Sequence, residues 1–244
     1  MANTALVWIR DDFRIQNNDA LTYATNQHDA VTAVFIFNSN IFDHKREAQK
    51  WWVSKSLENF KSDLKKLNIG LEIIKDDEIN FFSKIKSNSK ISVYWNKVYE
   101  PNELEKDKKI GTDFSKKNID FKFFKGNVLN EYNKITKNDG TPFKVYSPFW
   151  RNAEQFYLER LPDKINKVKK CKKINTLFKN QIKSEDILPK SDWYKKFEKY
   201  WEPSEQKAHE NLDNFIQKNI LNYGVDRDFP SIKGTSLLSP YIRN

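Results

Sequence analysis

Cysteine and glycine are scarce in this chain of 244 residues, which contains one Cys and six Gly. The single thiol, Cys171, excludes an internal disulfide framework and has no Cys or His neighbours at the spacing of a structural zinc site. We therefore expect no metal site, and a reducing compartment such as the cytoplasm. No apolar run approaches the roughly 20 residues that a membrane helix needs, so no membrane contact is expected.

Charge and aromatic content describe a basic, folded protein. Lys and Arg number 43 against 33 Asp and Glu, and 35 aromatic residues (18 Phe, 10 Tyr and 7 Trp) argue against disorder despite a mean hydropathy of −0.81. Residues 161–200 hold 12 Lys and no Arg against five acidic residues. Codon bias toward A/T can explain the excess of Lys over Arg in the whole chain. For residues 161–200, contact with a polyanion and a solvated linker are the two interpretations, and we favour the linker.

Apolar runs alternate with helix-period segments along the first 125 residues. The runs rich in β-branched and aromatic residues predict strands over 5–9, 31–37, 71–74, 91–95 and 119–124. The clearest helix is predicted over 46–67. It has an apolar stripe along one side, and Trp52 lies outside that stripe. This alternation predicts an α/β fold, a Rossmann-like five-stranded parallel sheet with flanking helices, in which Trp8, Trp51 and Trp95 pack in the core.

Parallel strands place a ligand crevice beyond their carboxyl ends, so residues 10–14, 38–44 and 96–103 should gather on one rim. Residues 8–14 contain no glycine, which argues against a dinucleotide fingerprint or a phosphate loop. We expect Arg10 and Arg14 to form an ion-pair cluster with Asp11 and Asp12, with Asp12 or Asn18 as a helix cap. A ligand role for this cluster is the alternative.

Two further features lie on the predicted rim. Asn102 and Glu103 follow Pro101 and mark a helix start, although an exposed Asn-Glu pair can also bind a heteroaromatic ring by hydrogen bonds. His44 should face the same rim, where a lone His is more often a surface residue than a ligand. The sequence has no Gly-x-Ser-x-Gly, no suggestive Cys/His pair and no His-Glu-x-x-His, which argues against hydrolase chemistry.

The pattern changes after Gly126. We expect a helix over 147–160, an aperiodic connecting segment over 163–190, and a second helix that starts at Pro203-Ser204-Glu205 and ends at Tyr223-Gly224. Ser239-Pro240 then marks another helix start.

Three segments together resemble the photolyase/cryptochrome family. The first is LVWIRDDFR (residues 6–14) followed by NNDAL (17–21), the second is TPFKVYSPF (141–149), and the third is YGVDRDFP (223–230) followed by GTSLLSPY (234–241). They occur in the order and at the spacing of the family. The resemblance covers the whole chain but only about half of a family member, so the chain looks like the N-terminal portion of a deoxyribodipyrimidine photolyase.

The resemblance implies three parts: an α/β antenna-binding domain over 1–130, a Lys-rich interdomain linker with one helix over 131–200, and the start of a helical FAD-binding domain over 201–244. In full-length members, reduced FAD donates an electron that splits a cyclobutane pyrimidine dimer flipped out of DNA, which is carbon-carbon lyase chemistry. The expected partner is damaged DNA containing pyrimidine dimers, and the expected state is a monomer. The catalytic residues are expected beyond Asn244.

The resemblance also assigns residues. FAD-binding positions of the family match Tyr223, Thr235, Ser236, Leu237, Leu238 and Ser239, although Thr235 or Ser236 can instead cap a helix. Arg227 matches a position near the DNA-binding face, with a local ion pair to Asp228 as the alternative. Many relatives have Arg where this chain has Leu237. Asn102, Glu103 and His44 match the site of a folate antenna, methenyltetrahydrofolate.

Three functions stay open at this point. The first is light-driven repair, which would belong to the full-length protein rather than to these 244 residues alone. The second is a cryptochrome-type blue-light photoreceptor without repair activity. The third is a nucleotide- or folate-binding module that acts alone, in which Leu237, Leu238 and Tyr241 would lack a partner surface.

Overall fold

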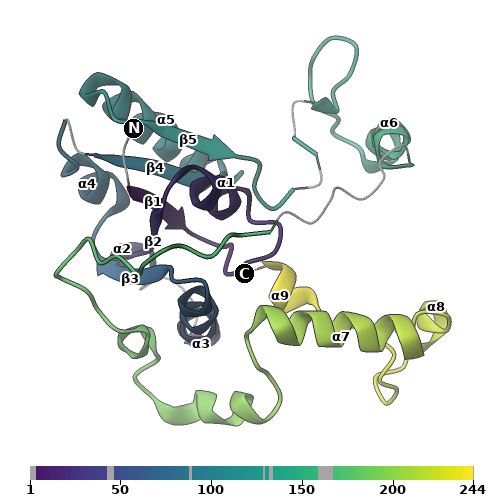
Figure 1. The fold of residues 1–244 in the computed structure, drawn as a ribbon. Helices are drawn as coiled ribbons and strands as arrows, with labels where there is room; N and C mark the ends of the chain where they lie inside the picture. Colours follow the sequence, from purple (N-terminus) through teal and green to yellow (C-terminus); the bar gives the residue numbers. More distant parts are fainter. Residues whose placement is uncertain are drawn as a thin grey trace.

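A computed structural model describes residues 4–42, 47–87, 90–128, 130–131, 134–158 and 167–243. Five parallel strands form one sheet in the order β3-β2-β1-β4-β5 (Figure 1). The strands are β1 (Thr4–Ile9), β2 (Ala30–Phe37), β3 (Gly70–Lys75), β4 (Ile91–Asn96) and β5 (Phe121–Phe124). Each predicted strand lies within two residues of an observed one, and the predicted Rossmann-like sheet is confirmed.

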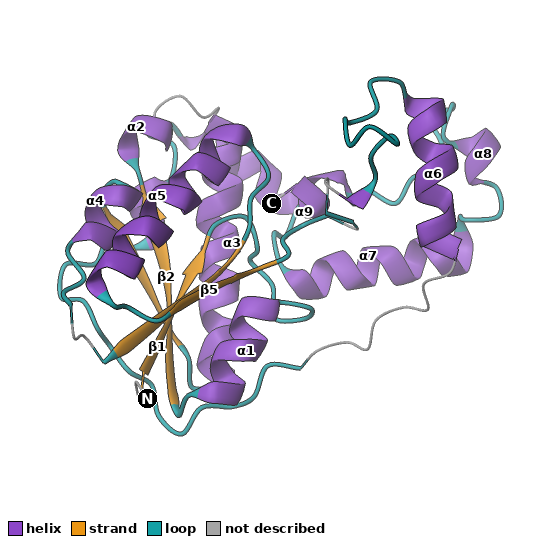
Figure 2. Cartoon of the chain, turned by 90° about the horizontal axis from the view of Figure 1, so that it is seen from above, coloured by secondary structure: helices purple, strands orange, loops and turns teal. Residues whose placement is uncertain are grey.

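Helices cover both faces of the sheet. α1 (Asp19–Gln27) and α3 (Glu47–Lys66) pack on one face, while α4 (Glu78–Ser83) and α5 (Pro101–Lys117) pack on the other (Figure 2). α2 (Ser39–Phe42) follows β2. Because neighbouring residues of a strand point to opposite faces, β1 contributes Val7 to one core and Trp8 to the other.

The predicted core tryptophans are buried: Trp8 and Trp51 are 1% exposed and Trp95 is 0% exposed. Trp52 is also buried, although it lies off the apolar stripe of α3. Its ring packs edge-on against Trp201 and Tyr241, with centroids 5.9 and 5.0 Å away. The C-terminal segment therefore covers the second face of α3, which explains two adjacent tryptophans on one helix.

The segment after residue 167 is anchored to the sheet rather than freely solvated. Its described lysines between 167 and 190 are exposed, but Val168, Cys171 and Ile187 are buried in the core beside α1 and α3. The backbone N–H of Ile182 donates to Ile73 O on the edge strand β3 at 2.9 Å. Figure 1 shows the segment passing along β2 and β3.

The remaining helices are α6 (Tyr146–Leu158), the 3₁₀ helices η2 (Ser184–Ile187) and η3 (Asp192–Lys199), α7 (Glu205–Lys218), α8 (Tyr223–Asp226) and α9 (Ser239–Arg243). α6 matches the helix predicted over 147–160, whose last two residues lie outside the described residues. Along the described residues, no helix has the length and apolar character needed to cross a membrane.

The prediction that one helix runs from Glu205 to Tyr223 was wrong. α7 ends at Lys218, because the backbone N–H groups of Asn219 and Ile220 both donate to Phe215 O and close the helix. The Asn219 side chain then donates to Lys233 O at 2.7 Å and holds the returning chain against the helix end.

Candidate functional site

The carboxyl end of β4 supplies the buried amide that organises the turn after β1. Asn96 Nδ2 donates to Asp12 Oδ2 at 2.6 Å and to Asn18 Oδ1 at 2.9 Å, and Asn96 Oδ1 accepts from Ala20 N at 3.1 Å. Asn18 is the N-cap of α1 and accepts from Leu21 N, which confirms it as a cap. β1 and β4 are neighbours in the sheet, so these contacts lie at its topological switch point.

The expected ion pairing of Asp12 with Arg10 and Arg14 was wrong. The Asp12 carboxylate turns inward to Asn96 and Asn18, and the guanidinium of Arg14 donates to Asn127 Oδ1 at 2.8 Å. Arg10 reaches across the rim to helix α5. Its guanidinium donates to both oxygens of Asp107, at 2.9 and 3.3 Å, and to Asn96 O at 2.5 Å.

An alternating chain of charges extends from Arg10 along the rim. Glu103 bridges Arg10 and Lys106, with N–O distances of 3.4 and 2.8 Å, and Lys106 also pairs with Glu78 at 3.0 Å. Glu78, the first residue of α4, accepts from Asn38 Nδ2 at 2.8 Å, which links the end of β2 to α4 and, through Lys106, to α5. Burial lowers the pKa of Lys106, but its hydrogen bond to Glu103 and the charge of Glu78 outweigh this effect and leave that pKa raised.

The structure brings only part of the predicted antenna site together. Glu103 stands on the rim with one carboxylate oxygen on Arg10 and the other on Lys106. Asn102 is exposed on the first turn of α5, where Pro101 occupies the first helical position, as a helix start requires. His44 lies outside the described residues. Segments 10–14, 38–42 and 96–103 share one rim, as the strand order predicts.

Sequence reasoning missed Asp107, which is the main partner of Arg10. Its side chain is 8% exposed. Burial raises the pKa of Asp107, and this effect exceeds the lowering by the positive charge of Arg10. A signal was present: Asp107 precedes the buried Ile110 by three positions and Phe114 by seven, so a carboxylate lies on the apolar stripe of α5. A charge on such a stripe requires a buried partner.

The structure does not bring all of the predicted FAD-binding residues together. Tyr223 begins α8, beyond the C-terminal end of α7, whereas Ser239 begins α9 near the N-terminal end of α7, where the Tyr241 hydroxyl donates to Glu202 O at 3.0 Å (Figure 1). Gly234 packs directly on α8, because a Cβ there would lie 2.5 Å from Asp226 Cβ and 2.9 Å from its backbone carbon. This close approach fixes the start of the turn 235–239 on α8, and the turn then leads to α9. The Tyr223 ring packs edge-on against Phe215, with centroids 5.4 Å apart.

The turn 235–239 leaves polar groups exposed. Thr235 and Ser239 are exposed, Leu237 adopts φ 54°, and Ser236 Oγ accepts from Leu238 N at 3.4 Å. Ser236 thus stabilises the turn before α9 from outside the helix. Hydroxyls and backbone amides in such a turn suit phosphate oxygens, so these residues fit a dinucleotide cofactor.

Arg227 follows α8 on the exposed side. Its Nε lies 3.7 Å from Asp228 Oδ1, and its guanidinium lies 5.7 Å from the centroid of the Tyr223 ring. The local ion pair considered for Arg227 is therefore present, and both side chains are more than half exposed. Among the residues that the structure describes, no group of three or more His, Cys, Asp or Glu side chains is placed to hold a metal ion.

The fold and the two regions define a class of protein: a Rossmann-like α/β domain that continues, through an anchored segment, into helices joined by an exposed turn with hydroxyl side chains. Comparison with known proteins identifies one family. A family model described as DNA photolyase matches residues 5–167. The chain belongs to the DNA photolyase family.

Named relatives include photolyases and cryptochromes. A deoxyribodipyrimidine photo-lyase of Agrobacterium fabrum is 30% identical over 97% of this chain and 50% of the relative. The crystal structure of a class III photolyase from Agrobacterium tumefaciens superposes with a TM-score of 0.85 at 29% identity, covering 99% of this chain and 50% of that one. Cryptochrome-2 of Arabidopsis thaliana is 25% identical over 99% of this chain and 41% of the relative. The chain thus spans about half the length of these relatives.

Proposed function

We propose that this chain forms the N-terminal part of a light-driven DNA repair enzyme that splits cyclobutane pyrimidine dimers. The observation that carries the proposal is its likeness to the Agrobacterium class III photolyase, with a TM-score of 0.85 at 29% identity over nearly the whole chain. Repair of this kind acts on damaged DNA and requires that the dimer leave the base stack.

The cofactor in this proposal is FAD. Tyr223 would pack against it, and the hydroxyls and amides of Thr235, Ser236 and Ser239, with the backbone of Leu237 and Leu238, would bind its phosphates. When bound and reduced, the flavin supplies the electron that opens the dimer. The chain's own contribution is to hold this turn in place, through Gly234 packed on Asp226 and the Asn219 amide on Lys233 O.

Arg227 would contact a DNA phosphate in this proposal. Its pair with Asp228 is long at 3.7 Å and exposed, so exchanging that carboxylate for a phosphate costs little. We therefore expect Arg227→Ala in the complete protein to weaken binding to damaged and undamaged DNA alike, and to reduce the salt dependence of binding.

We further propose a folate antenna at Asn102 and Glu103, with His44 as a third contact. Asn102 is exposed and can bind a ligand without breaking a described contact, whereas Glu103 must share its oxygens with Arg10 and Lys106. Asn102→Ala in the complete protein should therefore reduce folate absorbance in the near ultraviolet. Glu105→Ala, an exposed change on the same helix, is the control, and unchanged folate absorbance in Asn102→Ala overturns the assignment.

A domain boundary near residue 200 belongs to the same proposal, with the α/β domain over 1–130 and the segment 131–200 before it. Helices α6 and α7 lie beyond the carboxyl ends of the strands (Figure 1) and expose large apolar side chains. Tyr146 and Phe156 of α6 are 69% and 48% exposed, and Ile216 of α7 is 50% exposed. Isolated apolar side chains are common on surfaces, but a series along two helices is typical of an interface. We propose that the helical part of the photolyase fold covers them.

A cryptochrome-type photoreceptor is the second candidate, favoured by the match to cryptochrome-2 at 25% identity. Survival of photolyase-deficient bacteria separates the two functions. With the complete gene in an expression plasmid, repair predicts that blue light after ultraviolet exposure raises survival well above the dark control. Equal survival in light and dark favours the photoreceptor.

A further inference from the structure

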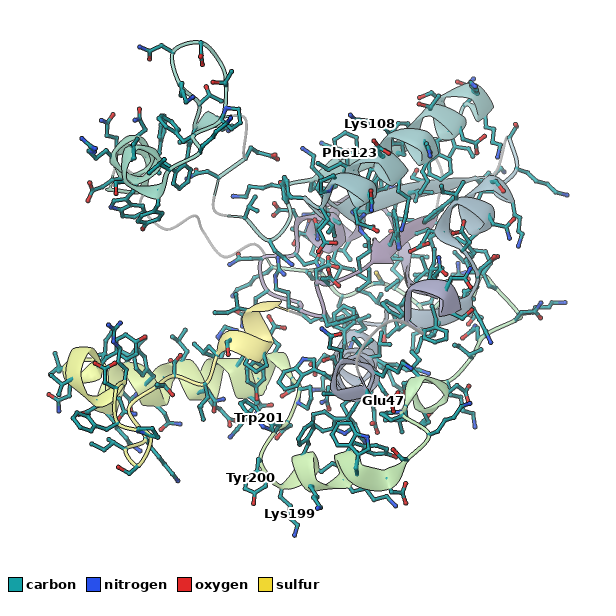
Figure 3. The ribbon with its side chains drawn as sticks, turned by 180° about the vertical axis from the view of Figure 1, so that it is seen from behind. Glu47, Lys108, Phe123, Lys199, Tyr200 and Trp201 are labelled. Carbon is teal, nitrogen blue, oxygen red and sulfur yellow. The ribbon has the colours of Figure 1, made fainter. Side chains whose placement is uncertain are left out.

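A groove lies between helix α5 and the edge strand β5, and Glu103 is not among the residues that line it. It encloses about 430 Å³, and its walls include Leu104, Lys108, Gly111 and Ser115 of α5 and Phe121 and Phe123 of β5. Figure 3 shows Lys108 and Phe123 beside each other on this flank. A volume of this size is in the range of small-molecule sites, roughly 300–1,000 Å³.

The floor of the groove is aromatic and rigid. Phe121 stacks on the fully buried Trp95, with centroids 5.8 Å apart and planes 9° apart. Phe123 is 46% exposed and lines the groove, with Lys97 Nζ 5.2 Å from its ring centroid. At Gly111, a Cβ would lie 3.1 Å from the Phe121 ring, so glycine lets the helix approach this floor closely. Such a floor can stack a planar ring.

The charges around the groove leave one cation uncompensated. Asp107 is paired with Arg10 at 2.9 Å, and Glu131 is paired with Lys97 at 3.1 Å. Within the described part of the chain, Lys108 forms no ion pair, and it lies one helical turn from Leu104 and Gly111 on the same wall. The groove therefore favours a ligand that brings a negative charge to Lys108.

The polar groups on the α5 wall select for hydrogen-bond donors. Thr112 Oγ1 donates to Lys108 O at 2.8 Å, and Ser115 Oγ donates to Gly111 O at 2.9 Å. Because each hydroxyl proton is used within the helix, each oxygen offers only lone pairs to the groove. An amino group on a ring satisfies these acceptors, whereas a carbonyl does not.

We propose that the α5–β5 groove binds an amino-substituted, planar heteroaromatic anion of the purine mononucleotide class. The ring stacks on Phe123, its amino group donates to Thr112 or Ser115, and its phosphate lies at Lys108. The inference does not rest on the repair function or on the antenna residues, because Asn102, Glu103, Tyr223 and the turn 235–239 do not line this groove.

Calorimetric titration of the 244-residue chain with AMP, adenosine and ribose 5-phosphate separates the parts of the site. We expect AMP to bind most tightly, adenosine more weakly, and ribose 5-phosphate not at all. Raising the salt concentration should weaken AMP binding and leave adenosine binding unchanged, because only the phosphate is attracted by charge.

Single substitutions assign the contacts. Phe123→Ala and Phe123→Leu should each weaken the binding of AMP and of adenosine about tenfold, which is the effect expected from the loss of one base-aromatic stack. Lys108→Ala should weaken AMP binding a few-fold, as expected for the loss of a partly exposed ion pair, and should leave the affinity for adenosine unchanged. Lys108→Arg should bind AMP as the parent chain does. Lys109→Ala and Phe156→Ala are matched controls, since both residues are exposed and lie outside the groove.

Three outcomes would overturn the proposal. One is the absence of saturable AMP binding at millimolar concentration. Another is AMP affinity in both Phe123 variants equal to that of the parent chain, with circular dichroism confirming that they are folded. The third is equal loss of affinity in the control variants, which would place the ligand elsewhere.

Discussion

Arg10 at the end of β1 donates to both carboxylate oxygens of Asp107 on α5, although 97 positions separate the two residues in the chain. Their side chains are 9% and 8% exposed. This buried pair joins the first strand of the sheet to the helix that carries Asn102, Glu103 and Lys108. The rim and the α5–β5 groove therefore share one structural anchor.

Removal of the Asp107 carboxylate should destabilise the chain strongly. Asp107→Ala leaves a buried guanidinium whose remaining charged partner among the described residues is Glu103, at 3.4 Å. Loss of one member of such a pair costs about 3 kcal/mol. Urea titration of the free energy of unfolding measures this cost. Glu105→Ala on the same helix is the control, and a loss no larger than in the control would show that the pair contributes nothing.

Glu205 should tie α7 to the α/β domain. Its carboxylate accepts from Ile15 N at 2.7 Å and from Gln16 N at 2.9 Å. Hydrogen bonds to a charged acceptor contribute about 2 kcal/mol, so Glu205→Ala should speed amide exchange at Ile15 and Gln16 by more than tenfold. His209→Ala, which removes an exposed ring 3.9 Å away, should leave these amides unchanged. Equal exchange in both variants would contradict this role.

Glu72 should give the chain a pH-dependent stability. Burial raises the pKa of Glu72, although its carboxylate accepts from Leu177 N at 2.6 Å and Phe178 N at 2.9 Å. The folded chain therefore holds this proton more tightly than the unfolded chain does. Above the ordinary Glu pKa, 4.5, stability should fall as pH rises through the raised value.

The Glu72→Gln variant isolates this effect, because a neutral amide oxygen still accepts a backbone N–H. The free energy of unfolding, measured from pH 4 to pH 8, should fall with pH more steeply in the parent chain than in the variant. Parallel curves for the two proteins would show that Glu72 titrates normally.

Gly126 should not tolerate a side chain. A Cβ at this position would lie 1.8 Å from Lys97 O and 2.9 Å from its carbonyl carbon, both backbone atoms that cannot rotate away. Gly126→Ala should lower the free energy of unfolding by about 2 kcal/mol or more, as overpacking does elsewhere. Gly224→Ala meets no atom within 4 Å and should be close to neutral. Thermal melting of both variants tests the contrast.

The sequence predicts the sheet well because buried parallel strands are short runs of apolar residues. The five strands and the helix Glu47–Lys66 follow from local pattern alone. The end of α7 does not, since no proline or glycine interrupts residues 205–222 and the helix stops through bonds from Asn219 and Ile220 to Phe215 O.

The candidate site is less predictable, because its contacts join distant parts of the chain. Local spacing identified Asn18 as a cap and the rim that includes Glu103, but paired Arg10 with its neighbours instead of Asp107. Glu72 and Glu205 bind backbone N–H groups more than 100 positions away. A buried carboxylate in an apolar pattern signals such a partner, yet its identity emerges only when the chain is folded.

The most direct test of the repair proposal is the loss of cyclobutane dimers from an ultraviolet-irradiated oligonucleotide. The bound FAD of the complete gene product is chemically reduced. The protein is then mixed with this DNA and either illuminated with blue light or kept in the dark. We predict that dimers disappear only in the light, and that this reaction is lost when Tyr223 and Thr235 are both replaced by Ala. Equal dimer content in light and dark, from a protein with bound FAD, would contradict the account.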